Sequence, residues 1–255
     1  MSEAVAPARA RPAAPRRGSD LRVEQQPAFV LHGYPWRETS LIVELLTRDA
    51  GRIAVVARGA KRATSQFRGL LAPFCPLSVS WSGRGDIRTL TRVEWGGALL
   101  PLRGEGLLAA FYLNELLVRL LARADPHENL YRCYAQALHG MAAGQQPHDA
   151  VLRQFELDLL RELGWLPSLE HCADGAPIDA AAAYRFDPVR GLERVQGVAD
   201  PLCLQGTTVQ AMRARAFTTP QAAAESKGVL RQMIRYHLNG KPLNTRRIFE
   251  DLKTL

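Results

Sequence analysis

The fold is decided by residues 40–69, which read SLIVELLTRDAGRIAVVARGAKRATSQFRG. Two β-branched runs, Ser40–Thr47 and Arg52–Ala57, flank the turn residues DAG, and this pattern predicts a β-hairpin. The second run leads into a loop of small and basic residues, and from Ala50 to Gly85 the sequence has no acidic side chain. The basic residues of this segment are Arg52, Arg58, Lys61, Arg62, Arg68 and Arg84. A strand that leads into an uncompensated cationic loop indicates a partner rich in phosphate.

Three further short strands are predicted around this hairpin. They are rich in β-branched and aromatic residues, and two of them alternate between apolar and polar positions. Their ranges are Ala28–Tyr34, ended by Pro35, then Leu77–Trp81 and Ile87–Trp95. Five short strands joined mostly by tight turns are typical of a small antiparallel barrel. The strand count favours a five-stranded OB barrel and leaves an SH3-like barrel as the alternative.

After Pro101 the pattern becomes helical, with apolar side chains at intervals of three and four residues. Asp149 is a candidate N-cap of one helix, and Thr219 followed by Pro220 marks the start of another. Short connections predict that the first three helices pack as an antiparallel bundle. The predicted helices are Leu107–Ala122, Asn129–Ala142, Ala150–Leu163, Thr208–Ala214, Gln221–Leu238 and Thr245–Leu252, with a small hairpin formed by Tyr184–Phe186 and Gly191–Val195.

These elements predict a multi-domain chain of the α+β class. Residues 1–22 are rich in Ala, Pro and Arg, and this composition predicts a disordered basic tail. An OB-fold barrel is expected at 23–100 and a helical domain at 101–255. The hairpin belongs to a small insertion in the helical domain at about residues 165–205.

Charge is distributed unevenly along the 255 residues, which carry a formal net charge of +8. The net charge is +4 over residues 23–100, −5 over 101–212 and +6 over 213–255. Two basic regions therefore flank an acidic middle, a pattern that concerns binding partners and not the fold. No apolar stretch approaches the length of a membrane span, and the tail lacks the apolar segment of a secretory signal.

The sequence carries few signs of catalysis or metal binding. It has no nucleophile elbow, phosphate-binding Walker loop, zinc-protease motif or dinucleotide-binding glycine motif. Its four cysteines form no CxxC pair, so free thiols are expected. We therefore expect a protein that is not an enzyme and that has no cofactor and no bound metal.

A second basic feature lies near the C-terminus. Lys227, Arg231 and Arg235 recur at four-residue intervals and so share one helix face. This stripe is either a second phosphate contact or an ordinary solvated helix surface. The aromatic residues near the basic loop allow two interpretations as well, because they either stack on bases or fill the barrel core. These residues are Tyr34, Trp36, Phe67, Phe74 and Trp81.

Several separated blocks of the sequence resemble the bacterial RecO family of recombination mediators. They run in the family's order from about residue 26 to the end of the chain. The blocks are AFVLHGYPWRETSLIVELLTRDAGRIAVVARGAKR, LLAPFCPL, GRGDIRTL, FYLNELLVRLL, LRQFELDLLRELGW and HLNGKPLNTRRIF. Some members of the family carry a four-cysteine zinc site after the LGW segment, but here only Cys172 remains at that place. The insertion is therefore expected to be a degenerate zinc finger without metal.

The resemblance implies an OB domain followed by a helical domain, and it also implies a function. RecO-like proteins bind single- and double-stranded DNA and anneal complementary strands. They contact the single-strand-binding protein SSB through its acidic, hydrophobic C-terminal tail. With RecR they help to load the RecA recombinase during gap repair. The resemblance thus predicts a cytoplasmic, nucleoid-associated DNA repair protein.

Two sets of site residues follow from these arguments. The predicted DNA-binding residues are Arg37, Arg52, Arg58, Lys61, Arg62 and Arg68, with Lys227, Arg231 and Arg235 as a second surface. The predicted SSB-tail groove is apolar and bounded by two arginines, and it consists of Arg119, Arg153, Phe155 and Leu159. Two rival readings stay open, namely an adaptor that binds only acidic protein tails and an enzyme with an unrecognised site.

Overall fold

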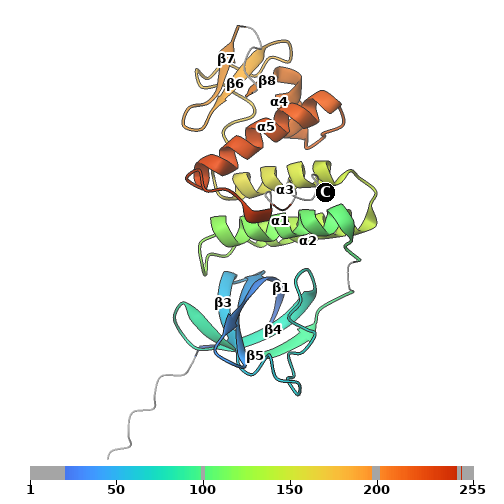
Figure 1. Ribbon diagram of the computed structural model, residues 1–255. Helices are drawn as coiled ribbons and strands as arrows, with labels where there is room; N and C mark the ends of the chain where they lie inside the picture. The colour runs from blue at the N-terminus through green and yellow to red at the C-terminus, as the bar shows by residue number, and fades with distance from the viewer. Residues whose placement is uncertain (1–20, 99–100, 197–201, 246–247, 249–255) are drawn as a thin grey trace, which may run out of the picture.

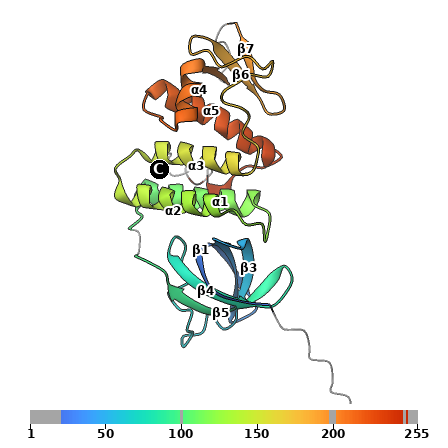
Figure 2. The same ribbon diagram turned by 180° about the vertical axis from the view of Figure 1, so that it is seen from behind.

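The computed structural model describes residues 21–98, 101–196, 202–245 and 248. Its elements stack in layers, and Figures 1 and 2 show this arrangement from opposite sides. The β-barrel lies at one end, three helices form the middle, and two further helices with a small sheet form the other end. Among the described residues, no helix combines the length and the apolar character needed to cross a bilayer.

The N-terminal strands form a closed barrel in the order β1-β2-β3-β5-β4. Their bounds are β1 Arg22–Trp36, β2 Ser40–Thr47, β3 Gly51–Ala57, β4 Pro76–Ser82 and β5 Ile87–Trp95. The long first strand pairs with both β2 and β4, and a parallel pairing between β3 and β5 closes the barrel. The predicted five-stranded OB barrel and the predicted α+β class are confirmed.

Strand β1 is longer than predicted and does not end at Pro35. Its pairing with β4 stops at Phe29, so residues 30–36 pair with β2 only and leave their other edge open. Proline is tolerated at such an edge because its missing N–H costs no ladder hydrogen bond. Past Phe29, β1 therefore continues as an edge strand that forms a hairpin with β2 through the turn at residues 37–39, while β3 pairs with the other edge of β2 as far as Leu41.

The helical region contains α1 to α5 and a three-stranded sheet of order β7-β6-β8. The helices are α1 Gly104–Leu120, α2 Glu128–Ala143, α3 His148–Glu162, α4 Gly206–Ala214 and α5 Pro220–His237. The strands are β6 Ala183–Asp187, β7 Gly191–Val195 and β8 Cys203–Gln205. The sequence predicted the β6–β7 hairpin but missed β8, because three residues carry too little alternation to be recognised.

Helix starts agree only in part with the sequence. The Thr219 side chain accepts a hydrogen bond from the Ala222 N–H at 3.2 Å, which confirms the predicted cap of α5. The predicted cap at Asp149 is wrong, because the N-cap of α3 is Pro147 and Asp149 lies in the first helical turn. Most of the predicted helix at 245–252 and nearly all of the tail at 1–22 lie outside the described residues.

The barrel and the helices share a buried contact. Phe29 and Leu31 of β1 belong to the same apolar cluster as α1, α2 and α3. The Asn114 side chain of α1 donates to the Leu31 carbonyl at 2.8 Å and accepts from the Tyr134 hydroxyl of α2. At Gly51, with φ of +66°, a Cβ atom would lie 1.8 Å from the Asp125 carbonyl oxygen. A glycine is therefore required for the β2–β3 turn to approach the α1–α2 connection.

Candidate functional site

The first candidate site is the basic loop between β3 and β4, which folds back onto the β1–β2 turn. Successive turns order the loop, with the N–H of Arg62 bonded to the Gly59 carbonyl and that of Arg68 to Ser65. The Lys61 N–H donates to the Thr39 carbonyl at 2.9 Å, and Lys61 Nζ reaches the Arg37 carbonyl at 3.4 Å. Two basic segments that are far apart in sequence therefore form one surface.

The cationic side chains of this surface point into solvent. Arg37, Arg58, Lys61, Arg62 and Arg68 are all exposed, and none forms an ion pair with a carboxylate among the described residues. Charges that lack a carboxylate partner are available to phosphate, whose neutralisation releases counterions and contributes much of nucleic-acid affinity. We call these five residues the basic barrel surface.

Arg52 does not belong to this surface, and this prediction needs correction. Its side chain is 12% exposed, and Nη1 donates to Glu44 Oε2 at 2.8 Å. Its Nε and Nη2 both donate to the Leu121 carbonyl at the end of α1, at 3.1 and 2.9 Å. Arg123 contacts the other oxygen of Glu44. The Arg52 guanidinium is thus occupied at the junction between the barrel and the helices.

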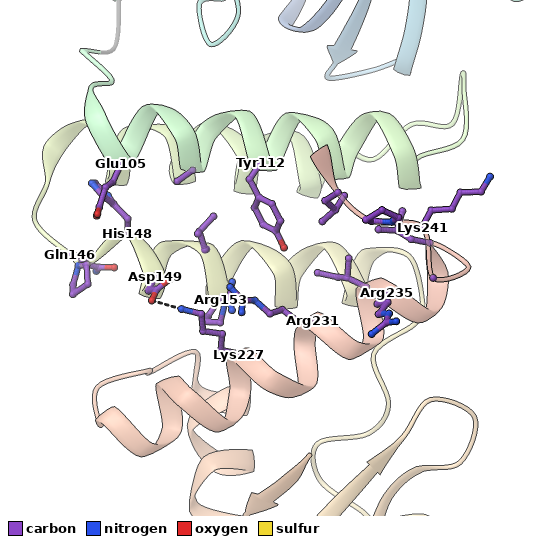
Figure 3. A pocket seen from close by; sticks show the side chains of 18 of the residues that line it. Glu105, Tyr112, Gln146, His148, Asp149, Arg153, Lys227, Arg231, Arg235 and Lys241 are labelled. Atoms are coloured by element: carbon purple, nitrogen blue, oxygen red, sulfur yellow. Dashed lines mark hydrogen bonds and ion pairs between the residues drawn. The ribbon is translucent and has the colours of Figure 1, made fainter. Parts of the chain in front are cut away.

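The second candidate site is a pocket of about 1020 Å³ between α1, α3 and α5. Its walls carry five cationic side chains, and its acidic lining residues are Glu105 and Asp149. The cations are Arg153, Lys227, Arg231, Arg235 and Lys241. Apolar side chains from the same helices include Leu152, Ile234 and Leu238. Figure 3 shows Tyr112 pointing from α1, and Lys227 and Arg231 from α5, into the space beside Arg153. We call this site the cationic pocket.

Arg153 is the most buried cation in the pocket, with 2% of its surface exposed. Its Nη2 donates to Glu156 Oε1 at 2.5 Å, and the Tyr112 hydroxyl donates to the same oxygen at 2.6 Å. Burial raises the pKa of Glu156 although the positive charge of Arg153 opposes this shift. Arg153 Nε and Nη1 are buried and have no hydrogen-bond partner within the described chain. Such unpaired donors favour an anionic ligand.

At the rim of the pocket, Lys227 Nζ contacts Asp149 Oδ2 at 2.8 Å (Figure 3). Partial burial raises the pKa of Asp149, but the hydrogen bond and charge of Lys227 outweigh it and hold this pKa below its usual range. Asp149 therefore forms an internal ion pair with Lys227, one of the five cations of the pocket. Its place in the first turn of α3 explains why the sequence suggested a helix cap and not this ion pair.

The four residues predicted to form the SSB-tail groove do not line one common site in the structure. Arg153 lines the pocket, but Arg119 is held by Glu115 and by the Pro242 carbonyl. Phe155 and Leu159 are buried, and Phe155 packs edge-on against Tyr134 of α2. The basic stripe of α5, predicted as a separate DNA surface, faces Arg153 across the pocket instead. Two features that are about 75 residues apart in sequence therefore belong to one site.

No metal centre is found in the described part of the chain, which contains no group of three or more His, Cys, Asp or Glu side chains placed to bind an ion. Cys172 is buried, and its thiol lies 3.0 Å from Asp174 Oδ1 and 3.2 Å from the Ala176 carbonyl. The Cys172 thiol thus contacts two hydrogen-bond acceptors. Burial raises its pKa, which disfavours the thiolate form that binds metals.

Comparison with known proteins identifies the family. Residues 21–98 match the family model of the N-terminal part of recombination protein O, and residues 102–247 match that of its C-terminal part. The chain belongs to the RecO family. It is 49% identical over 251 residues to the DNA repair protein RecO of Ralstonia nicotianae, covering 95% of this chain and 92% of that protein.

Two further RecO proteins agree with this placement. The DNA repair protein RecO of Burkholderia pseudomallei is 47% identical over 248 residues, covering 96% of this chain and 89% of its own. That of Nitrosospira multiformis is 44% identical over 237 residues, covering 92% and 98%. Membership of the RecO family gives the chain a role in DNA repair and recombination. The basic barrel surface and the cationic pocket are its candidate binding sites.

Proposed function

We propose that the chain is a DNA-binding mediator that binds single- and double-stranded DNA through the basic barrel surface and anneals complementary strands. The observation that carries this proposal is the group of five exposed cations that the docked loop and turn bring together, none of which pairs with a carboxylate in the part of the chain that the structure describes. An annealing protein needs affinity for phosphate without regard to sequence, since base pairing supplies the specificity. It needs no covalent chemistry, so we propose no enzymatic activity.

The cationic pocket has a second role in this proposal. An acidic and hydrophobic peptide would place carboxylates against Arg153 and the α5 cations and apolar side chains against Leu152 and Ile234. These properties are those of the SSB C-terminal tail that RecO-like proteins bind. We therefore propose SSB as a direct partner, with RecR and RecA as the proteins alongside which the chain acts at the nucleoid in the cytoplasm.

The DNA proposal is tested by measuring binding to labelled single-stranded DNA across a range of salt concentrations. The double variant Lys61→Glu/Arg62→Glu should bind more weakly and show a shallower dependence of affinity on salt, because phosphate contacts are lost. Its matched control is Arg190→Glu/Arg194→Glu, which makes the same change of charge on the β6–β7 hairpin at the far end of the molecule (Figure 1). Equal weakening by both variants would mean that net charge alone governs binding and that the surface has no special role.

The peptide proposal is tested by calorimetry with a peptide of the SSB tail. Lys227→Ala/Arg231→Ala should weaken binding by about tenfold, since two charge-assisted contacts are removed. Arg213→Ala, which removes an exposed cation of α4 outside the pocket, should bind like the parent. Wild-type affinity in the double variant contradicts the assignment. Arg153→Ala alone is a poor test, because it would leave Glu156 buried without its charge partner and so destabilise the fold.

Annealing itself is measured with complementary strands coated by SSB. The parent chain should accelerate duplex formation, and both Lys61→Glu/Arg62→Glu and Lys227→Ala/Arg231→Ala should slow it. If neither coated nor bare strands anneal faster with the parent chain than without it, the mediator proposal fails and the protein-only adaptor becomes the better reading.

A further inference from the structure

Strand β1 carries three rings at alternate positions, which are His32, Tyr34 and Trp36. A bulge between Val30 and His32 sets their register, so that they lie opposite Glu44, Ile42 and Ser40 of β2. Side chains two residues apart on a strand share one face. The Glu44 side chain is bonded to Arg52 and Arg123 outside the barrel interior, so the three rings lie on the outer face of the sheet.

The rings are not part of a core. Tyr34 is 42% exposed and Trp36 is 43% exposed, whereas Phe67, Phe74 and Trp81 are buried. Of the five aromatic residues that the sequence offered for base stacking, only Tyr34 and Trp36 present their rings to solvent. The neighbouring strand β4 does not cover them, because its pairing with β1 stops at Phe29. His32 and Tyr34 are in edge contact, with ring centroids 4.4 Å apart.

Cationic side chains lie next to the last ring of the row, Trp36. The Arg37 guanidinium lies 5.9 Å from the centroid of the Trp36 ring, and Lys61 Nζ contacts the Arg37 carbonyl. Arg58 follows directly after Ala57, which pairs with Leu41 of β2. Exposed aromatic rings next to cations that no described carboxylate neutralises match a ligand with flat faces and a negative backbone. That ligand is a single strand of nucleic acid with unpaired bases.

We propose that His32, Tyr34 and Trp36 form a stacking platform for unpaired bases, and that this platform makes the barrel prefer single strands to duplex. The proposal rests on the DNA-binding function proposed above and adds the form of DNA that this site selects. Backbone positions two residues apart on a strand are spaced by about 6.8 Å, and the His32 and Tyr34 rings tilt toward each other until their centroids are 4.4 Å apart. An unpaired strand can turn the faces of its bases onto these rings, whereas a duplex hides the faces of its bases.

The platform is tested with the full chain and three labelled probes of equal length, namely single-stranded DNA, duplex DNA and an abasic strand that keeps the phosphates. Trp36→Ala should lower affinity for single-stranded DNA about tenfold, the typical effect of removing one stacked ring. It should leave the salt dependence and the affinity for the abasic strand unchanged. Trp36→Phe should recover most of the loss. Tyr34→Ala should act in the same direction as Trp36→Ala.

The matched control is Trp95→Ala, which removes a ring of the same type with 48% exposure at the end of β5. It should bind all three probes like the parent. Unchanged binding of single-stranded DNA by Trp36→Ala and Tyr34→Ala overturns the platform, and so does an equal loss on all three probes. If those variants bind normally while Lys61→Glu/Arg62→Glu binds poorly, the platform fails and the proposed DNA binding stands. If the parent chain binds no probe at low salt, both proposals fail.

Discussion

Replacement of Arg52 by alanine tests whether this residue of β3 stabilises the fold or binds a DNA phosphate. In the structure its guanidinium bonds to Glu44 and twice to the Leu121 carbonyl, at the junction of barrel and helices. Removal of a buried partner from a charged pair typically costs about 3–5 kcal/mol. Arg123 still contacts Glu44 in the variant, which lowers the expected cost. We expect the free energy of unfolding to fall by about 3 kcal/mol.

The same variant should leave DNA binding almost unchanged. An arginine that neutralises a phosphate contributes about 0.7 to the slope of log affinity against log salt for single strands. Because Arg52 is occupied inside the protein, we expect Arg52→Ala to keep the slope of the parent chain, whereas Arg62→Ala should reduce it. Urea denaturation followed by circular dichroism gives the first quantity, and salt titration of labelled single-stranded DNA gives the second.

The reasoning is refuted by a variant with the stability of the parent chain and a slope reduced by about 0.7, since Arg52 would then be a phosphate contact. The control for stability is Arg48→Ala, whose exposed ion pair with Asp49 should contribute little to the unfolding midpoint. If Arg52→Ala and Arg48→Ala lower the free energy of unfolding equally, then removal of any charge from this part of the barrel destabilises the chain to the same extent.

Three further outcomes are expected. Asp149→Asn should raise the affinity of the cationic pocket for an SSB-tail peptide about threefold, because Lys227 loses its internal carboxylate; calorimetry measures this, and lower affinity contradicts it. Gly51→Ala should destabilise the chain by at least about 2 kcal/mol in urea denaturation. The control Gly69→Ala has a similar positive φ of +76° but open space, so it should cost less. Burial raises the pKa of Glu156 above its ordinary value of 4.5, so the folded state keeps this proton to higher pH than the unfolded state does. The free energy of unfolding should therefore fall as the pH rises from 4.5 through the raised pKa. Glu156→Gln should remove this part of the pH dependence, and an unchanged profile rules the effect out.

The barrel could be predicted because its signals are local. Alternating or β-branched runs at Ser40–Thr47 and Gly51–Ala57 and a glycine-containing turn are sufficient to specify a hairpin. The helical stripe of α3 was equally clear, since its apolar side chains recur at the helical period. Pro35 misled the prediction because proline stops a strand only where its N–H is needed, and that depends on which neighbouring strand is present.

The sites were harder to predict because they depend on contacts between distant segments. Arg52 and Arg58 are both bases in or after β3, yet one faces the end of α1 and the other faces solvent. Nothing in the local sequence separates them. Similarly, Arg153 and the α5 stripe were assigned to different surfaces, because only the packing of α3 against α5 brings them together. Phe155 shares the helix of Arg153, but at two residues' distance it points into the core and not into the pocket.

The placement of the pocket also resolves a conflict in the charge pattern. An acidic peptide should avoid residues 101–212, whose net charge is −5, and yet α1 and α3 of this region form two walls of the pocket. Four of the five cations in the pocket come from α5 and the residues just after it, within the region of net charge +6. The basic C-terminal region thus converts an acidic bundle into a local anion site. Because these cations face the pocket and not the barrel, Lys227→Ala/Arg231→Ala should weaken peptide binding while the salt slope of DNA binding stays that of the parent chain. A reduced slope would return the α5 stripe to the DNA surface.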